Sequence, residues 1–276
     1  MPVLTPTDVR ALLSEHGLRP SRALGQNFLA DPNTARRIAR IAEVGRGDRV
    51  LEIGPGLGSL TLALAETGAD VLALELDRHL LPVLEGVVAG EPGVSVEAGD
   101  ALTFDFEARL GGQGWHCVSN LPYNVATPVL LRLLTDAPQV ERFVVMVQRE
   151  VGERLAAEPG SKAYGTPSVR VAYHATARLC GSVPASVFVP RPKVESVLVC
   201  LDRRPAPAVD VSSPALMFEL VHAGFAQRRK MLRRSLRPVL GDRADAVLVS
   251  AGIDPSRRAE AIDLDGWAAL AQEASS

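Results

Sequence analysis

The sequence of 276 residues predicts an α/β fold, with a mostly parallel sheet wound by helices on both faces and a small all-helical C-terminal domain. Two observations predict this fold. Apolar, strand-like runs alternate with helical segments over about two thirds of the chain, and beyond Pro214 the pattern is helical only. A hydrophobic content of 47% with 22% charged residues is ordinary for a globular protein and argues against extensive disorder.

The strand-like runs follow one another in a regular order. The buried strands are expected at residues 49–54, 70–75, 94–100, 116–120 and 142–147. Helices are expected between and after them, at 59–68 (closed by a glycine), 78–89 and 148–157. Two later extended segments, 175–183 and 193–201, could form an antiparallel edge pair on the parallel sheet.

A proline-rich hinge at 203–214 separates two predicted domains. The larger domain spans 1–205 and includes an N-terminal helical extension, 1–45; the smaller one spans 206–276.

Charge and cysteine content restrict the partners and the compartment. The net charge is −2, so a nucleic-acid partner must be held by a local basic patch. Cys117, Cys180 and Cys200 are odd in number and lack metal-ligand spacing, so we expect core thiols in a reducing compartment and no metal site. Without an apolar signal core or a run long enough to cross a bilayer, the chain is expected to be cytoplasmic.

A glycine loop and two acids predict the pocket. "EIGPGLGSLT" places Gly54, Gly56 and Gly58 between a strand and a helix, where a ligand can approach the backbone closely. The G-x-G-x-G spacing differs from the G-x-G-x-x-G that binds a pyrophosphate. Glu75 ends the next strand, where an acid meets a ribose hydroxyl, and Asp100 follows the third strand, where it could accept from an adenine amine. Together they indicate a Rossmann-like S-adenosylmethionine pocket.

The stretch "VSNLPYNVATP" ends a strand abruptly, because Pro122 donates no amide hydrogen and biases Leu121 toward extended backbone. Asn120 and Tyr123 then emerge at the carboxyl end of the strand. Methyl transfer to an aromatic amine needs acceptors for its two N–H groups and a ring that fixes the base plane. Asn120 and a backbone carbonyl of the Leu121-Pro122 turn can accept, and Tyr123 can stack.

A second aromatic residue lies in the proline-braced segment "SVFVPRPKVES". Phe188 of this segment could sandwich a splayed-out base opposite Tyr123.

These motifs, with "LGQNFL" near the N-terminus and "FAQRRKMLRRSL" near the C-terminus, resemble the ribosomal RNA adenine N6-dimethyltransferases over nearly the whole chain. They are most similar to the housekeeping small-subunit type. The resemblance implies that Asn120 and Tyr123 are catalytic, with Phe188 near the target base. It implies S-adenosylmethionine contacts by Asn27, the Leu29 backbone, Gly54, Glu75, Asp100 and Asn120. One departure is Ser119, where the family often has glycine.

The same resemblance implies the substrate. Two adjacent adenosines in the 3′-terminal hairpin of 16S rRNA would each receive two methyl groups, within an immature small ribosomal subunit. The protein is expected to act as a monomer and without a metal.

A basic run supports an RNA partner independently of the resemblance. "FAQRRKMLRRSLR" contains six basic residues and no acid: Arg228, Arg229, Lys230, Arg233, Arg234 and Arg237. In one continuous helix, most of these cations would share a face opposite apolar residues such as Leu232 and Leu236. A charged face of this kind suits phosphate contacts. "ARRIAR" (35–40), after the cap-like Asp31-Pro32, is a weaker candidate.

Three other interpretations remain open at this point. One is a macrolide-resistance type methyltransferase acting on large-subunit RNA, which shares the glycine loop and the Asn-Leu-Pro-Tyr turn. Another is a non-catalytic RNA-binding assembly factor. A nicotinamide dehydrogenase is disfavoured by the glycine spacing and by the lack of a proton-relay histidine near the strand ends.

Overall fold

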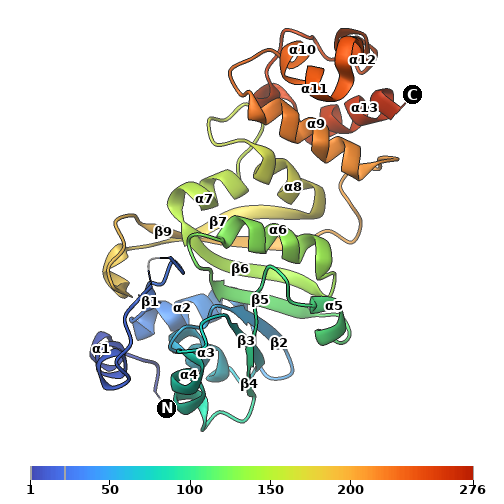
Figure 1. Ribbon diagram of the computed structural model, residues 1–276. Coiled ribbons are helices and arrows are strands. Elements are labelled where there is room, and N and C mark those ends of the chain that lie inside the picture. The colour runs from blue at the N-terminus through green and yellow to red at the C-terminus, as the bar shows by residue number, and fades with distance from the viewer. Residues whose placement is uncertain (1, 22, 276) are drawn as a thin grey trace. The chain divides into compact units, whose positions relative to one another are not determined.

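The computed structural model describes residues 2–21 and 23–275 and divides into two compact units (Figure 1). The sheet unit comprises residues 1–152 and 178–203, and the helical unit comprises residues 153–177 and 204–276. The division after Arg203 is close to the predicted boundary at 205. The predicted larger domain is nevertheless too inclusive, because the segment 153–177 belongs to the helical unit.

A seven-stranded sheet forms the centre of the sheet unit, in the order β4-β3-β2-β5-β6-β9-β7 (Figure 1). All pairs from β4 to β6 are parallel, whereas β9 runs antiparallel to β6. The expected parallel sheet with an antiparallel edge is therefore confirmed. The strands are β2 (Arg49–Ile53), β3 (Asp70–Glu75), β4 (Val94–Ala98), β5 (Trp115–Asn120), β6 (Val140–Gln148), β7 (Ala175–Val183) and β9 (Ser196–Arg203).

Helices connect these strands and cover both faces of the sheet (Figure 1). They are α1 (Pro6–Glu15), α2 (Pro32–Ala42), α3 (Ser59–Ala65), α4 (Leu81–Val88), α5 (Phe106–Arg109), α6 (Ala126–Asp136), α7 (Arg149–Leu155) and the 3₁₀ turn η1 (Ala185–Val187). The helical N-terminal extension is present, and α2 begins as the sequence predicts. Asp31 Oδ1 accepts the Thr34 N–H at 2.6 Å, and Pro32 occupies the first turn.

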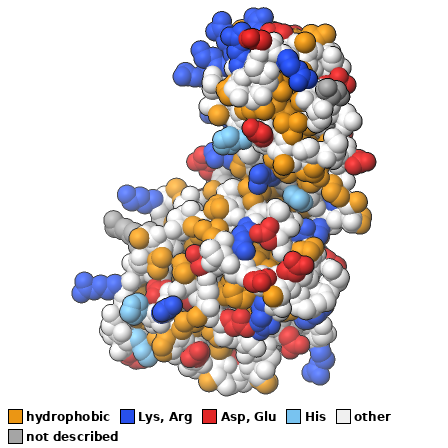
Figure 2. Space-filling view, turned by 45° about the vertical axis from the view of Figure 1, so that its right-hand side comes forward, with side chains coloured by type: hydrophobic (Ala, Val, Ile, Leu, Met, Phe, Trp, Pro, Cys, Tyr) orange, Lys and Arg blue, Asp and Glu red, His pale blue; other side chains and the backbone are white. Residues whose placement is uncertain are grey.

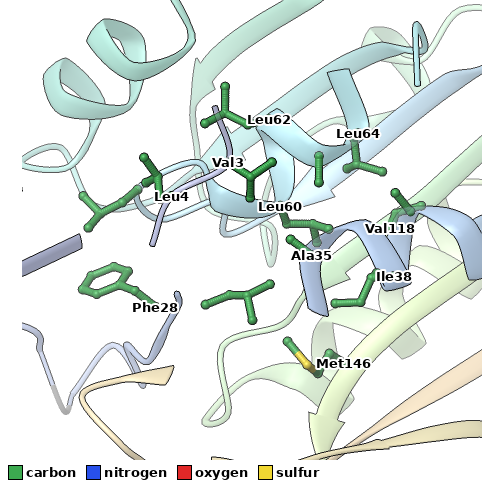
Figure 3. Packing of buried hydrophobic residues seen from close by; sticks show 14 of the residues in the cluster. Val3, Leu4, Phe28, Ala35, Ile38, Leu60, Leu62, Leu64, Val118 and Met146 are labelled. Atoms are coloured by element: carbon green, nitrogen blue, oxygen red, sulfur yellow. The ribbon is translucent and has the colours of Figure 1, made fainter. Parts of the chain in front are cut away.

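The core on one face of the sheet is built from α2, α3 and α4 packed on the strands (Figure 3). Side chains from α2 and α3 meet the middle strands in a close-packed layer that leaves each at most 5% exposed: Ala35, Ile38, Leu60, Leu62, Leu64, Val118 and Met146. Since β5 and β6 are buried in this close-packed layer, the packing holds the carboxyl ends of both strands in place.

The helical unit has its own apolar core around the fully buried Trp267. Its helices are α8 (Thr166–His174), α9 (Pro214–Ala226), α10 (Leu232–Ser235), α11 (Arg237–Leu240), α12 (Ala244–Ser250) and α13 (Leu264–Ser275), with 3₁₀ turns η2 (Gly241–Arg243) and η3 (Ala259–Ala261). The predicted all-helical character beyond Pro214 is confirmed. Helix α8 was not among the sequence predictions.

The expectation of three free core thiols is wrong. Cys180 of β7 and Cys200 of β9 form a disulfide between neighbouring strands, and Cys117 is the buried free thiol among the described residues. An odd cysteine count is equally compatible with one bonded pair and one free thiol, and only the sheet order brings this pair together. The thiol content therefore gives no support for a reducing compartment.

Within the part of the chain that the structure describes, no helix combines the length and the apolar character needed to span a bilayer.

Helix α7 packs so closely on β9 that one glycine cannot be replaced without strain. A Cβ on the buried Gly152 would lie 2.3 Å from Val197 Cγ2 and 3.1 Å from Val199 Cγ2. Gly152→Ala should therefore lower the free energy of unfolding by about 1–3 kcal/mol, as overpacked core substitutions do. Urea denaturation measures the change.

The matched control is Gly86→Ala in α4, because Gly86 is exposed and a Cβ there would meet nothing within 4 Å. This variant should be as stable as the wild type or more stable by up to about 1 kcal/mol, since alanine has the higher helix propensity. Equal stabilities for the two variants would contradict the packing described for Gly152.

Candidate active site

A pocket opens at the carboxyl ends of the parallel strands. Its volume is about 1120 Å³ with the open solvent at its mouth included, and its walls come from Leu24–Leu29, the glycine loop and the ends of β3, β4 and β5. In the sheet, β3 lies beside β2 on one side and β5 lies beside β2 on the other, so the direction in which strands are added reverses at β2. Ligands of open α/β sheets bind at such a switch in strand order.

Strands β2 and β5 part at this point. Their register runs from Arg49↔Trp115 to Leu51↔Cys117, and no later pair is formed between described residues. The Ser119 hydroxyl lies where the ladder has ended, and it accepts the N–H of Ile53 at 2.9 Å. A buried backbone donor is thereby satisfied while the strands separate. Ser119, the departure from the family pattern, thus has a structural role.

The glycine loop approaches two neighbouring segments that also line the pocket. Gly54 and Gly56 have φ angles of 69° and 61°, a region that disfavours residues with a Cβ. A Cβ on Gly54 would lie 3.1 Å from the Pro122 ring, and one on Gly56 would lie 2.9 Å from the Phe28 ring. The loop is therefore packed between the Asn-Leu-Pro-Tyr turn and the "LGQNFL" segment.

The two acids predicted for the pocket both line it. Glu75 is 6% exposed, and its carboxylate accepts the N–H groups of Gly56 at 3.0 Å and Asp77 at 2.8 Å. Burial raises the pKa of Glu75, although these two N–H groups oppose the shift. Asp100 Oδ1 accepts the N–H of Leu102 at 2.8 Å, which fixes its carboxylate at the turn after β4.

A third acid, Glu52, lines the pocket and was not predicted. It is 1% exposed, and its Oε2 has no hydrogen-bond partner among the described residues. Burial raises the pKa of Glu52 to about 8, and the negative charge of Glu75 adds to the shift. The sequence signal was a carboxyl inside an otherwise apolar strand, which is costly unless the group is neutral or has a function.

The charge of the pocket indicates which ligands fit. Three carboxyl groups line it, and none of the described lining residues is a lysine, arginine or histidine. A pyrophosphate would find no cationic side chain there. An ammonium group and ribose hydroxyls would find hydrogen-bond acceptors, and a sulfonium would find negative charge. No group of three His, Cys, Asp or Glu side chains among the described residues could hold a metal ion.

Asn120 ends β5 at the floor of the pocket. Its Nδ2 donates to the Asn27 carbonyl at 3.2 Å, which fixes the orientation of the amide. Its Oδ1 is buried and has no partner among the described residues. A buried acceptor without a partner costs free energy, so a ligand N–H at this position would be stabilised. The Leu121 carbonyl beside it likewise accepts no hydrogen bond from a described residue, whereas the Pro122 carbonyl accepts the Val125 N–H.

Tyr123 and Phe188, the two rings predicted to sandwich a base, contact each other directly. Tyr123 lines the pocket, whereas Phe188 is 3% exposed and is not among the lining residues. Their ring centroids are 6.5 Å apart in an edge-on contact. The Tyr123 hydroxyl is 2.6 Å from Ser196 Oγ, so the ring is fixed at its far end. Burial raises the pKa of Tyr123, which keeps the phenol protonated at neutral pH. Ser196 was missed by sequence reasoning because nothing in one sequence pairs it with a tyrosine far along the chain.

A two-stranded antiparallel ribbon joins the N-terminal segment to the Phe188 segment. It pairs β1 (Phe28–Leu29) with β8 (Phe188–Val189), in the register Leu29↔Phe188. Leu29, one of the residues predicted to contact S-adenosylmethionine, is therefore paired directly with Phe188, and Asn27 immediately precedes the ribbon. Both Asn27 and Leu29 line the pocket.

The basic segment near the C-terminus is not one continuous helix, so this prediction was wrong. Helix α9 ends at Ala226, a turn follows, and α10 starts only at Leu232. The N–H groups of Leu232 and Arg233 donate to the carbonyls of Arg257 and Pro255, which anchors the chain to a distant loop. Lys and Arg side chains nevertheless gather on one part of the helical unit (Figure 2).

The six cations of this segment are not equivalent. Arg228 donates to Glu260 at 3.1 Å and to the Lys162 carbonyl at 2.6 Å, so it has a structural role. Arg237 lies 3.6 Å from the fully exposed Asp242. The expectation of a run without counter-charges thus fails for these two residues. In the weaker candidate segment, Arg36 pairs with Glu66 and Arg37 donates to the Ser182 carbonyl.

Comparisons with known proteins agree with this geometry. The model of the ribosomal RNA adenine dimethylase family matches residues 18–275. A ribosomal RNA small subunit methyltransferase A from Cutibacterium acnes is 47% identical, with 98% of this chain and 94% of that protein covered. The protein of the same name from Thermobifida fusca is 46% identical, with 98% of this chain and 96% of that protein covered.

Solved structures give the same fold. The crystal structure of the 23S rRNA methyltransferase ErmE matches with a TM-score of 0.69 and 25% identity, over 91% of this chain and 100% of that one. A dimethyladenosine transferase from Plasmodium falciparum matches with a TM-score of 0.71 and 23% identity, over 88% and 95%. The fold and the pocket define a Rossmann-like methyltransferase. Within that class, the chain belongs to the ribosomal RNA adenine dimethylase family and is an rRNA adenine dimethyltransferase.

The raised pKa of Glu52 gives a prediction about stability. The carboxyl is protonated in the folded chain up to about pH 8, but in the unfolded chain it ionises near its ordinary value of 4.5. The unfolded state therefore binds fewer protons across this range, and the free energy of unfolding falls as the pH rises. Glu52→Gln removes this contribution. Between pH 5.5 and 7.5 the variant should gain about 1–2 kcal/mol relative to the wild type, within the limit of about 1.4 kcal/mol per pH unit.

Urea unfolding at the two pH values measures this difference, and the exposed Glu85 supplies the control. Glu85→Gln should keep the pH dependence of the wild type. A Glu52→Gln variant with an unchanged pH dependence would mean that the carboxyl is ionised in the folded protein.

Proposed function

We propose that this enzyme uses S-adenosylmethionine to dimethylate the N6 amines of two adjacent adenosines in the 3′-terminal hairpin of 16S rRNA. The substrate would be an immature small ribosomal subunit in the cytoplasm. The observation that carries the proposal is the buried, unpartnered Oδ1 of Asn120 at the floor of an acid-lined pocket. The names of the relatives, ribosomal RNA small subunit methyltransferase A, support the choice of RNA.

The donor side of the pocket would be formed by the segments already described. Glu75 would accept from ribose hydroxyls and Asp100 from the adenine amine, while Asn27, the Leu29 backbone and Gly54 would complete the walls. S-adenosylmethionine, when bound, supplies an electrophilic methyl group on a sulfonium. The carboxylates of Glu75 and Asp100 would favour its positive charge, and the described lining residues include no lysine, arginine or histidine that would attract a phosphate.

The acceptor side would hold the adenosine amine by two carbonyl oxygens. Asn120 Oδ1 and the Leu121 carbonyl can each accept one N–H, which directs the nitrogen lone pair away from the base plane. Because the Nδ2 of Asn120 is held by Asn27, the acceptor is oriented before the substrate arrives. A new N–CH₃ bond forms as the S–CH₃ bond breaks, and the proton leaves from the methylated nitrogen to solvent.

No strong base is needed in this scheme, which agrees with the protonated state of Tyr123. The contribution of Tyr123 and Phe188 would be to fix the base plane, since aromatic faces stack on splayed-out bases. The Ser196 hydroxyl holds Tyr123, and β1 holds Phe188. The alignment of donor and acceptor would then supply the larger part of the rate enhancement.

Recognition of the RNA outside the pocket would fall to the basic segment. Two of the six cations, Arg228 and Arg237, lie next to acidic side chains. The remaining cations of the segment are Arg229, Lys230, Arg233 and Arg234. A local patch is required because the chain as a whole carries a net charge of −2.

The macrolide-resistance type is the second candidate, and the fold of ErmE favours it. The higher identity to the small-subunit relatives favours the 16S assignment. Mass-spectrometric mapping of dimethyladenosine in RNA from cells with and without the protein separates the two. Loss of modification in 16S rRNA supports the proposal; loss in 23S rRNA supports the alternative. No loss in either would leave a non-catalytic assembly factor.

Asn120→Ala should abolish measurable methyl transfer, with a loss of at least about 100-fold, because an oriented acceptor in a dry site is removed. Affinity for S-adenosylmethionine should fall but stay measurable by calorimetry. The control is Asn33→Ala, the same substitution at an exposed residue of α2 outside the pocket. Full activity of Asn120→Ala would refute the role of this amide.

Arg233→Glu/Arg234→Glu should weaken binding to small-subunit RNA and flatten its salt dependence. Each lost phosphate contact lowers the slope of log K against log[salt] by about 0.7–0.9, so a decrease of about 1.5 is expected. Filter binding at several salt concentrations measures the slope. Arg228→Ala should instead destabilise the helical unit, because its guanidinium binds Glu260 and the Lys162 carbonyl. A wild-type slope in the double variant would exclude this patch.

A further inference from the structure

The loop that follows Phe188 is fixed at both ends to one aromatic ring. At its start, the Phe188 ring contacts Tyr123 with a centroid distance of 6.5 Å. At its end, Ser196 Oγ lies 2.6 Å from the Tyr123 hydroxyl. The segment between them, 189–195, is therefore held beside the ring that would carry the target base. We call this segment the Tyr123 loop.

Two cations of the Tyr123 loop, Arg191 and Lys193, are exposed. Each is three residues from an anchor, Phe188 or Ser196, so its Cα lies within about 11 Å of that anchor. Long side chains at these positions can reach groups around the mouth of the pocket. Neither cation forms an ion pair or a side-chain hydrogen bond with any residue that the structure describes.

The one acid of the loop is already engaged. Glu195 pairs with Arg149 at 2.8 Å, and the Arg149 N–H donates to the Glu195 carbonyl at 3.0 Å. This contact fixes the end of the loop and leaves Arg191 and Lys193 without a compensating charge. Val194 beside them is 46% exposed, which adds an apolar contact surface between the cations and the anchor.

The charge of the pocket explains why the cations of this loop matter for binding a nucleotide. A nucleotide whose base enters the pocket carries phosphates on both sides, and none of the described lining residues has a positive charge. Binding those phosphates therefore requires cations outside the pocket but close to its mouth. The helical-unit patch belongs to another compact unit, whereas the Tyr123 loop is part of the sheet unit that contains the pocket.

We infer that Arg191 and Lys193 bind the phosphates flanking the target adenosine and so position its base against Tyr123. This assignment rests on the proposed RNA substrate. The two residues do not line the pocket, so they act as positioning residues and should not affect the donor.

The test is an Arg191→Ala/Lys193→Ala double variant, assayed on undermethylated small ribosomal subunits from cells that lack the enzyme. The KM for subunits should rise about tenfold with kcat within about twofold, and the slope of log K against log[salt] should decrease by about 1.4, at about 0.7 per single-strand phosphate. Calorimetry should give the wild-type affinity for S-adenosylmethionine. Arg191→Lys/Lys193→Arg, which keeps both charges, should restore most of the affinity.

The matched control is Arg46→Ala. Arg46 is exposed and precedes β2 at the amino end of the sheet, away from the carboxyl ends that form the pocket. It should leave KM and the salt slope unchanged.

The outcomes separate the two levels of the proposal. If the wild-type enzyme methylates the subunits and the double variant keeps its KM and salt slope, the assignment of the loop is overturned and the proposed function stands. If the wild type neither binds nor methylates the undermethylated subunits, the proposed function fails and this inference fails with it. A defect on subunits that is absent on protein-free RNA would indicate an acidic protein partner and overturn the phosphate assignment.

Discussion

The site depends on the separation of β2 from β5. Paired strands would close the sheet at this point, but the ladder ends after Leu51↔Cys117, and the Ser119 hydroxyl takes over the Ile53 N–H. The opening exposes the glycine loop on one side and Asn120 on the other. Because both strands are buried in the packed core, the separation is a fixed feature of the fold. The side chains on these two edges determine the chemistry of the pocket.

Most of the sheet could be predicted from the sequence because its strands are apolar runs bounded by glycine, proline or acids. The segments 70–75 and 175–183 match β3 and β7 residue for residue. The prediction of one continuous basic helix was wrong for a physical reason. Leu232 and Arg233 donate to carbonyls of a loop more than twenty residues away, and no local periodicity reveals such a contact. The same limit applies to the Cys180–Cys200 bond, which depends on the order of strands.

The candidate site was predictable where a single residue type is demanded by local geometry. The sequence places Gly54 and Asn120 at the ends of predicted strands, within the glycine loop and the Asn-Leu-Pro-Tyr turn. The contacts that orient these residues were not predictable, because they join distant segments: Asn120 with the Asn27 carbonyl and Tyr123 with Ser196. Glu52 shows a further limit. Its position in an apolar strand was visible, but its protonation depends on burial and on the charge of Glu75, which only the fold supplies.

The β1–β8 ribbon has a mechanical consequence. Leu29, which lines the pocket, and Phe188, which contacts Tyr123, are partners in one short ladder. Neither strand can shift without breaking backbone hydrogen bonds or carrying its partner along. Under the proposed function, a ligand that shifts Leu29 would also shift Phe188, and any resulting linkage between the two binding partners would have to be mutual.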